Sequence, residues 1–211
     1  MDSVLFDLDG NLWDATDPIF ESWDRVLRAE KSVREPFTKA QLQNCFGKML
    51  SEIGRILFPY LTEEESNRII DLCSAEEIRD LRTRGGTPYP GLFETLSELK
   101  TKYRLLLVSN CQSGYIEAFL AFTGLEGMFY SHLCPGDTGE GKAENISRIV
   151  REFGLTSPVY VGDTASDYEA AKRANVPFIF ASYGFGKVEG TEKIASLSEL
   201  PSLLARLDFE A

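Results

Sequence analysis

The sequence predicts an α/β fold in which a parallel sheet forms the core and an all-helical segment is inserted near the start of the chain. Apolar, strand-like runs alternate with helical segments along most of the sequence, and residues 16–84 interrupt this alternation. Near-continuous apolar runs are typical of parallel strands that are covered by helices on both faces. These two observations together indicate a sheet core with a helical insertion.

The predicted strands are four short apolar runs. They are VLFDL (4–8), RLLLVSN (104–110), PVYVGD (158–163) and PFIFAS (177–182). Two of the segments between them have a helical pattern: GLFETLSELKTKY repeats apolar residues at Leu92, Leu96 and Leu99, and ENISRIVREFG ends at Gly154. We expect both helices to pack on the sheet.

The insertion contains helical patterns such as IFESWDRVLRAE and EEESNRIIDLCSAEEIRDLRTR, and it offers no convincing strand. A helical insertion after the first strand explains this better than a continued series of alternating strands and helices. The segment RGGTPYPG, with paired glycines and two prolines, marks the return to the sheet. We therefore expect a core of residues 1–15 and 85–211 and a helical cap of residues 16–84.

Composition narrows the classes of partner. The chain has 211 residues and 43% hydrophobic side chains, which is enough for a real core, and 22 basic against 33 acidic residues give a net charge of -11. This charge repels nucleic acid and anionic lipid, so we expect neither as a partner. No run approaches the roughly 20 apolar residues of a membrane span, and no signal-like segment begins the chain.

The four cysteines, Cys45, Cys73, Cys111 and Cys134, lie far apart and form no CxxC pair. We interpret them as reduced thiols. The expected location is therefore the cytoplasm, and we expect a monomer or homodimer.

Polar residues finish several of the predicted strands. They are Asp7 and Asp9, Ser109 and Asn110, and Asp163 and Asp167 in VGDTASD, with Lys142 opening a helix after GEG. In an open α/β sheet, ligands bind outside the carboxyl ends of the strands, so these residues should lie together although they are distant in sequence. Four carboxylates, a hydroxyl, an amide and an ammonium make a coherent site for a divalent cation and a phosphate.

The chemistry of such a site follows from its ligands. Mg²⁺ prefers oxygen ligands and commonly joins protein carboxylates to a substrate phosphate, and Asp7 and Asp163 are the best placed side chains. With a metal shielding its charge, a carboxylate can attack a phosphoryl group, and a second carboxylate can protonate the leaving alcohol and later activate water. Asp7 and Asp9 suit these two roles.

These motifs resemble the haloacid dehalogenase superfamily of phosphatases, with a Rossmann-like core and a helical cap inserted after the first motif. The aspartate pair appears as DLDGNLWDA, the Ser motif as VSN, the lysine as GKAENI and the acidic motif as GDTASD. The order is that of the family over nearly the whole chain. The resemblance is closest to the phosphoglycolate phosphatase-like branch, in which PYPGLFETLSELK and ASYGFG are also familiar.

The resemblance implies roles for individual residues. Asp7 would be the nucleophile, and Asp9 would be the general acid and base, with its backbone carbonyl facing the Mg²⁺. Ser109 and Lys142 would hold the phosphoryl oxygens. Asp163 would complete the metal shell, whereas Asp167 would bind the metal through water or orient Lys142.

The sequence departs from the family pattern at Asn11, where threonine is usual. We expect this asparagine to tune the loop and to leave the chemistry intact. Related dehalogenases generally lack the acid two residues after the nucleophile and need no metal. The presence of Asp9 therefore favours phosphate over halide as the group that is removed.

Substrate choice should depend on the cap, which can close over the strand ends and exclude water. The segment NCFGKML (44–50) is our candidate for a substrate-facing loop, because its glycine permits a turn and Lys48 offers a cation. Arg55 is a second candidate in the cap, and Asn110 is a candidate substrate ligand in the core. His132 and Cys111 are interpreted as structural residues.

The sequence therefore predicts a Mg²⁺-dependent phosphomonoesterase that acts on a small phosphorylated metabolite, such as phosphoglycolate or a sugar phosphate, through a phosphorylated Asp7. A phosphomutase of the same superfamily is the enzymatic alternative. The alternatives from another class are a phospho-accepting signalling domain and a non-catalytic binding protein on the same fold.

Overall fold

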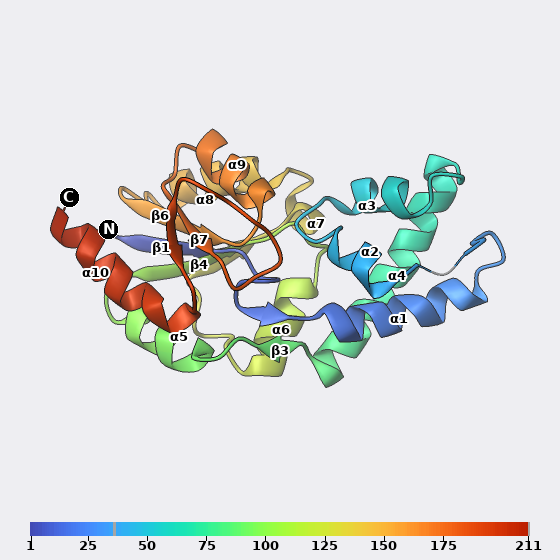
Figure 1. Ribbon diagram of the computed structural model, residues 1–211, viewed down its shortest axis with the longest axis horizontal. Helices are drawn as coiled ribbons and strands as arrows, with labels where there is room; N and C mark the ends of the chain where they lie inside the picture. The colour runs from blue at the N-terminus through green and yellow to red at the C-terminus, as the bar shows by residue number, and fades with distance from the viewer. Residues whose placement is uncertain (36, 211) are drawn as a thin grey trace.

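The computed structural model describes residues 1–35 and 37–210, and its sheet lies beside a group of helices (Figure 1). The strands are β1 (Ser3–Phe6), β2 (Trp13–Asp14), β3 (Thr87–Pro88), β4 (Arg104–Val108), β5 (Ser131–Leu133), β6 (Pro158–Gly162), β7 (Phe178–Ala181) and β8 (Glu192–Ile194). The helices are α1 (Thr16–Ala29), α2 (Lys39–Gln43), α3 (Leu50–Leu57), α4 (Glu63–Arg84), α5 (Leu92–Lys100), α6 (Tyr115–Thr123), α7 (Pro135–Thr138), α8 (Lys142–Glu152), α9 (Ala165–Arg173), the short 3₁₀ helix η1 (Leu197–Glu199) and α10 (Leu200–Glu210).

The main sheet of the described residues has six parallel strands in the order β5-β4-β1-β6-β7-β8. The first strand is central: Phe6 lies beside Leu107 of β4 on one side and Val161 of β6 on the other. The strand order reverses on either side of β1. The carboxyl ends of β1, β4 and β6 are therefore neighbours at the place where this class of sheet binds ligands.

Helices cover both faces of the sheet (Figure 1). Side chains of successive strand residues point to opposite faces. Leu5 packs with apolar residues of α8 and α9, whereas Val4 and Phe6 belong to the larger core that includes α5, α6 and α10. The four predicted strands and the two predicted helices are confirmed. Helices on both faces of the sheet explain why these strands are apolar along nearly their whole length.

Residues 16–84 form the helices α1 to α4 and contain no strand among the residues described (Figure 1). Helix α1 packs along α4, and Trp23 of α1 is fully buried between them and their neighbours. The chain leaves the sheet through β2 and returns through β3, and these two strands pair in antiparallel fashion. The segment RGGTPYPG contains β3, and the division of the chain between residues 84 and 85 stays a prediction.

The outer strands carry the weakest sequence signal. His132 lies on β5 at one edge of the sheet, and β8 at the other edge, with the sequence EKI, has no apolar run that would predict it. The four cysteines are buried free thiols. Within the described part of the chain, no helix is long and apolar enough to cross a membrane.

Candidate active site

The carboxyl ends of the central strands bring together the side chains that the motifs predict. Asp7 follows β1, Ser109 and Asn110 follow β4, and Asp163 follows β6, while Lys142 and Asp167 lie in the first turns of α8 and α9. Lys142 Nζ donates to Asp7 Oδ1 at 2.8 Å and to Asp167 Oδ1 at 2.5 Å. A buried ion-pair cluster thus connects residues that are 135 and 25 positions apart in the sequence.

The glycine of the DLDG motif permits the close approach of two loops. Gly10 has a φ of +78°, and a Cβ at this position would lie 2.2 Å from Asp163 Oδ2. A side chain would therefore clash with the acidic loop after β6 and would also strain the backbone. The glycine that directly follows the two aspartates is explained by this contact.

Asn11 fastens the same loops to each other. Its Nδ2 donates to the carbonyl oxygens of Asp7 at 3.1 Å and Val161 at 3.0 Å, and the Tyr183 hydroxyl donates to Asn11 Oδ1 at 3.2 Å. The side chain is fully buried. Asparagine at this position thus joins the ends of β1 and β6, which positions Asp7 relative to Asp163.

The electrostatics of the cluster are dominated by buried negative charge. Burial raises the pKa of Asp7, and the nearby Asp167 carboxylate raises it further. Burial and the neighbouring Asp167 and Asp7 also raise the pKa of Asp163. Burial alone would lower the pKa of Lys142, but the carboxylates of Asp167 and Asp7 hold it well above its usual value. One ammonium therefore faces three carboxylates.

The donor set fits a hard divalent cation such as Mg²⁺. One carboxylate oxygen from each of Asp7, Asp163 and Asp167 lies within 4.8 Å of the others, and Asp163 Oδ1 is buried with no hydrogen-bond partner. Asp167 is more fully used, because its Oδ2 accepts from the backbone and hydroxyl of Thr164 and from the Asp163 amide. Oxygen ligands with excess negative charge are what Mg²⁺ requires.

Asp9 has a different environment from Asp7. The Tyr115 hydroxyl donates to Asp9 Oδ1 at 2.6 Å. Burial raises the pKa of Asp9 to about 8, and the negative charges of Asp7 and Glu77 contribute to this rise. The raised pKa of Asp9 favours its protonated form, which can donate a proton, while Asp7 is held beside an ammonium.

A cavity of about 50 Å³ opens next to Asp7 and Asp9. One wall comes from the strand ends and includes Ser109 and Asn110. The other wall comes from residues 16–84 and includes Trp23, Lys48 and Glu77. Asn110 Nδ2 donates to the Gly47 carbonyl at 2.9 Å, which joins the two walls.

A family model described as "Haloacid dehalogenase-like hydrolase" matches residues 4–181, which is most of the chain and includes every strand end of the site. The chain belongs to the haloacid dehalogenase-like hydrolase family. The aspartate pair and the Ser motif of this hydrolase line the cavity, and Lys142, Asp163 and Asp167 lie beside Asp7.

Curated relatives of this haloacid dehalogenase-like hydrolase match along nearly their whole length. The phosphoglycolate phosphatase of Rhodobacter capsulatus is 25% identical, with 99% of this chain and 94% of the relative covered. A plasmid-encoded phosphoglycolate phosphatase of Cupriavidus necator is 28% identical, with 96% and 92% covered. A solved structure titled as a predicted phosphoglycolate phosphatase from Haemophilus somnus has a TM-score of 0.85 at 20% identity, with 97% and 98% covered, and supports the fold.

Lys48 and Arg55, the two candidate substrate-binding residues of residues 16–84, lie in different places in this haloacid dehalogenase-like hydrolase. Lys48 lines the cavity, where its ammonium lies 3.3 Å from Glu52 Oε1. The structure does not bring Arg55 to the cavity, because its side chain is 67% exposed and faces Glu63. Arg55 lies on the solvent-facing side of α3, which explains why it does not reach the cavity.

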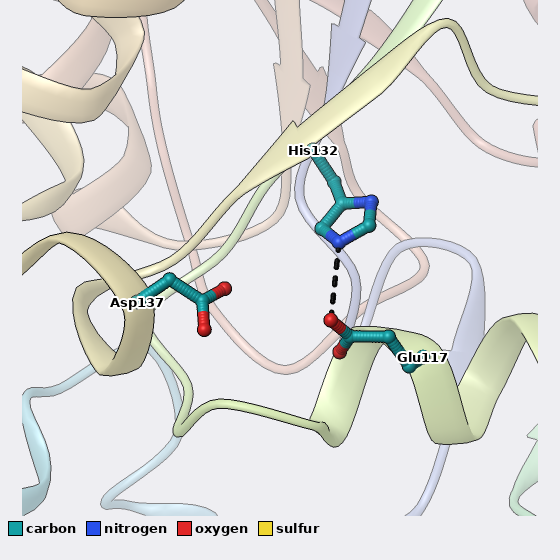
Figure 2. A group of neighbouring side chains, drawn as sticks. All are labelled: Glu117, His132 and Asp137. Carbon is teal, nitrogen blue, oxygen red and sulfur yellow. Dashed lines mark hydrogen bonds and ion pairs between the residues drawn. The ribbon is translucent and has the colours of Figure 1, made fainter.

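A second group of side chains whose types can ligate a metal consists of Glu117, His132 and Asp137 (Figure 2). His132 Nε2 lies 3.3 Å from Glu117 Oε1, and the exposed Asp137 completes the group. Glu117 and His132 are only partly buried. None of the three lines the cavity, and the structural role of His132 stays a prediction.

Sequence reasoning missed three residues that shape the cavity: Glu77, Gln112 and Tyr115. Gln112 and Tyr115 follow the VSN motif and are placed by the turn into α6. Glu77 has a signal that could have found it. It falls on the apolar face of α4, in register with the buried Ile70, Cys73 and Leu81, where a carboxylate is unusual.

Proposed function

We propose that this protein is a Mg²⁺-dependent phosphomonoesterase that hydrolyses a small phosphorylated metabolite through an aspartyl-phosphate on Asp7. One observation carries the proposal: two aspartates two positions apart border one cavity, and Asp7 contacts the Lys142 ammonium whereas Asp9 accepts from the Tyr115 hydroxyl. Asp7 is held beside the Lys142 ammonium, and burial raises the pKa of Asp9 to about 8, which favours its protonated form. A nucleophile and a general acid require this division.

In the first step, a carboxylate oxygen of Asp7 forms a bond to the substrate phosphorus, and the bond from phosphorus to the ester oxygen breaks. Asp9 gives its proton to the departing oxygen, so that an alcohol leaves. The Tyr115 hydroxyl, at 2.6 Å, holds the Asp9 carboxyl in place. Lys142 stays beside Asp7 and offsets the negative charge of the phosphoryl oxygens.

In the second step, Asp9 accepts a proton from a water molecule, and the hydroxide attacks phosphorus. The bond between phosphorus and Asp7 breaks, which releases inorganic phosphate and restores both carboxyl groups. Ser109 and Asn110 line the same wall and are proposed to donate to the phosphoryl oxygens. Each round therefore consumes one water and leaves the chain unchanged.

Asp7 and Asp163, with the Asp9 carbonyl, are proposed to hold the Mg²⁺, and Asp167 is proposed to orient Lys142 or to bind the metal through water. The unpartnered oxygen of Asp163 supports the first assignment, and the four donors to Asp167 support the second. Bound Mg²⁺ would neutralise the phosphate and the carboxylates so that two anions can meet.

Residues 16–84 are proposed to act as a cap over the core of residues 1–15 and 85–211. The wall that this segment contributes to the cavity supports the assignment. A cap of this kind would exclude water during the first step and present Lys48 to the outer part of the substrate. The names of the curated relatives make phosphoglycolate one candidate substrate, and a sugar phosphate is the other.

The test is a phosphate-release screen over small phosphomonoesters, run with Mg²⁺ and with EDTA on the wild type and on Asp7→Asn. The variant keeps the shape of the side chain and removes the nucleophile. We expect metal-dependent release by the wild type and a loss of at least about 10³-fold in the variant. Release of phosphate rather than a rearranged phosphate ester separates the phosphatase from a phosphomutase. Normal turnover by Asp7→Asn would exclude the covalent mechanism.

A further inference from the structure

Glu77 is a buried carboxylate in the wall of the cavity opposite the strand ends. It lies on α4 and is only 3% exposed. Its Oε2 accepts from Trp23 Nε1 at 2.5 Å, and its Oε1 accepts from Gln112 Nε2 at 2.8 Å. No ion pair reaches Glu77 within the described part of the chain. A buried carboxylate without a cation is costly, so its presence beside a substrate cavity requires a reason.

The position of the phosphoryl group fixes what Glu77 can contact. If Asp7 is the nucleophile, the phosphorus lies against the strand ends, beside Ser109 and Lys142. The leaving group then extends toward the other wall of the cavity, to which Glu77 belongs together with Trp23 and Lys48. The whole cavity, which must also hold the phosphoryl group, has a volume of about 50 Å³, so the leaving group must be small.

The charge of the cavity wall disfavours an anionic leaving group. Asp7 and Glu77 border the cavity as acidic groups, and Lys48 is the one basic residue that lines it within the described residues. Lys48 is 35% exposed and already lies beside Glu52. A substrate carboxylate in this position would face Glu77 with no uncompensated cation to receive it.

We propose that Glu77 selects substrates whose leaving group donates a hydrogen bond, through a hydroxyl or an ammonium, and rejects those whose leaving group carries a carboxylate. Each Glu77 oxygen accepts one hydrogen bond in the structure, so each retains capacity for another donor. A site built to accept a hydrogen bond discriminates strongly against a group that cannot donate one. This inference rests on the proposed phosphatase function and separates the chain from the activity named for its curated relatives.

Three phosphate esters of nearly equal size provide the test: 2-hydroxyethyl phosphate, ethanolamine phosphate and phosphoglycolate. They present a hydroxyl, an ammonium and a carboxylate at the same distance from phosphorus. We expect the wild-type kcat/KM with Mg²⁺ at pH 8 to be at least about tenfold higher for one of the first two than for phosphoglycolate. Comparison of kcat/KM for the first two esters shows whether the site prefers a hydroxyl or an ammonium donor. A wild type that hydrolyses phosphoglycolate best would overturn the inference.

Variants show whether Glu77 causes the preference. In Glu77→Gln the ratio of kcat/KM values should fall toward one, mainly by a gain for phosphoglycolate. Gln112 can rotate its amide to satisfy the new side chain, so the fold should persist. Glu77→Asp should keep the direction of the preference, which supplies a second variant if glutamine is not tolerated. An unchanged ratio in Glu77→Gln would assign the residue a merely structural role.

The control is Glu76→Gln, which removes the neighbouring carboxylate on the same helix. Glu76 pairs with Arg25 and Arg79 outside the cavity, so its loss should leave the ratio unchanged. p-Nitrophenyl phosphate serves as an activity standard with an apolar leaving group. If the wild type hydrolyses none of the four esters, the proposed function itself fails, and the inference fails with it. Hydrolysis with the opposite preference overturns only the role of Glu77.

Discussion

Asn11 is the residue whose effect on stability follows most directly from its contacts. It donates to two backbone carbonyls at the ends of β1 and β6, and both contacts are buried. In Asn11→Ala these carbonyls lose their donor, so we expect the free energy of unfolding to fall by about 2 kcal/mol. Denaturant unfolding of the two proteins would measure this difference. Asn11→Thr, which restores one hydroxyl donor, should lose less, and equal losses in both variants would contradict the account.

Alanine substitutions at Gly10 and Gly124 can be compared directly, because both glycines have a positive φ and differ in what surrounds them. Both have a positive φ, +78° and +70°, but a Cβ at Gly124 would meet nothing within 4 Å. Gly124→Ala should therefore cost only about 1 kcal/mol of stability, from the backbone alone, and leave turnover unchanged. Gly10→Ala should cost more and reduce kcat, because the added methyl displaces Asp163. Thermal melts and steady-state kinetics would compare them, and equal effects would contradict the proposed close approach.

At the scale of elements, the N-terminal caps of α4 and α9 can be compared by the same substitution. Thr62 caps α4 together with Glu65, and Thr164 caps α9 together with Asp167, by the same reciprocal hydrogen bonds. Thr62→Ala and Thr164→Ala should each lower stability by about 1 kcal/mol. Only Thr164→Ala should also reduce kcat, because Thr164 holds the carboxylate that orients Lys142. Loss of activity in Thr62→Ala of the same size would show that the effect is general destabilisation.

The elements also show how far sequence alone predicts this molecule. The central strands and their polar ends were predicted because each is a local pattern, an apolar run followed by Asp, Ser or Asn, and parallel topology gathers such ends at one edge. Glu77 was missed because its importance depends on what packs against α4. The sequence does not show that Arg55 faces Glu63, because the rotation of α3 decides that contact. Patterns along the chain thus predict the cavity wall formed by the strand ends better than the wall formed by residues 16–84.

At the scale of the whole molecule, Mg²⁺ held by the acidic cluster as proposed would link stability to the metal. Asp163 is buried with an unpartnered oxygen and gains most from a cation. We expect Mg²⁺ at 100 times its dissociation constant to stabilise the wild type by about 2.7 kcal/mol. Asp163→Asn should lose this gain and, in EDTA, should be at least as stable as the wild type, because a buried charge is removed. Thermal melts with and without Mg²⁺ would show equal gains in both proteins if the assignment were wrong.

The central claim is that Asp7 becomes phosphorylated, and the most direct test is to trap that species. p-Nitrophenolate leaves without a proton, so Asp9→Asn should still form the phosphoenzyme from p-nitrophenyl phosphate but should hydrolyse it slowly. After Mg²⁺-dependent reaction and acid quench, mass spectrometry should find one added phosphoryl group on the peptide that contains Asp7. The same group should be absent in EDTA and in a protein that also carries Asp7→Asn. Turnover without any phosphorylated peptide, or a phosphoryl group on another residue, would contradict the account.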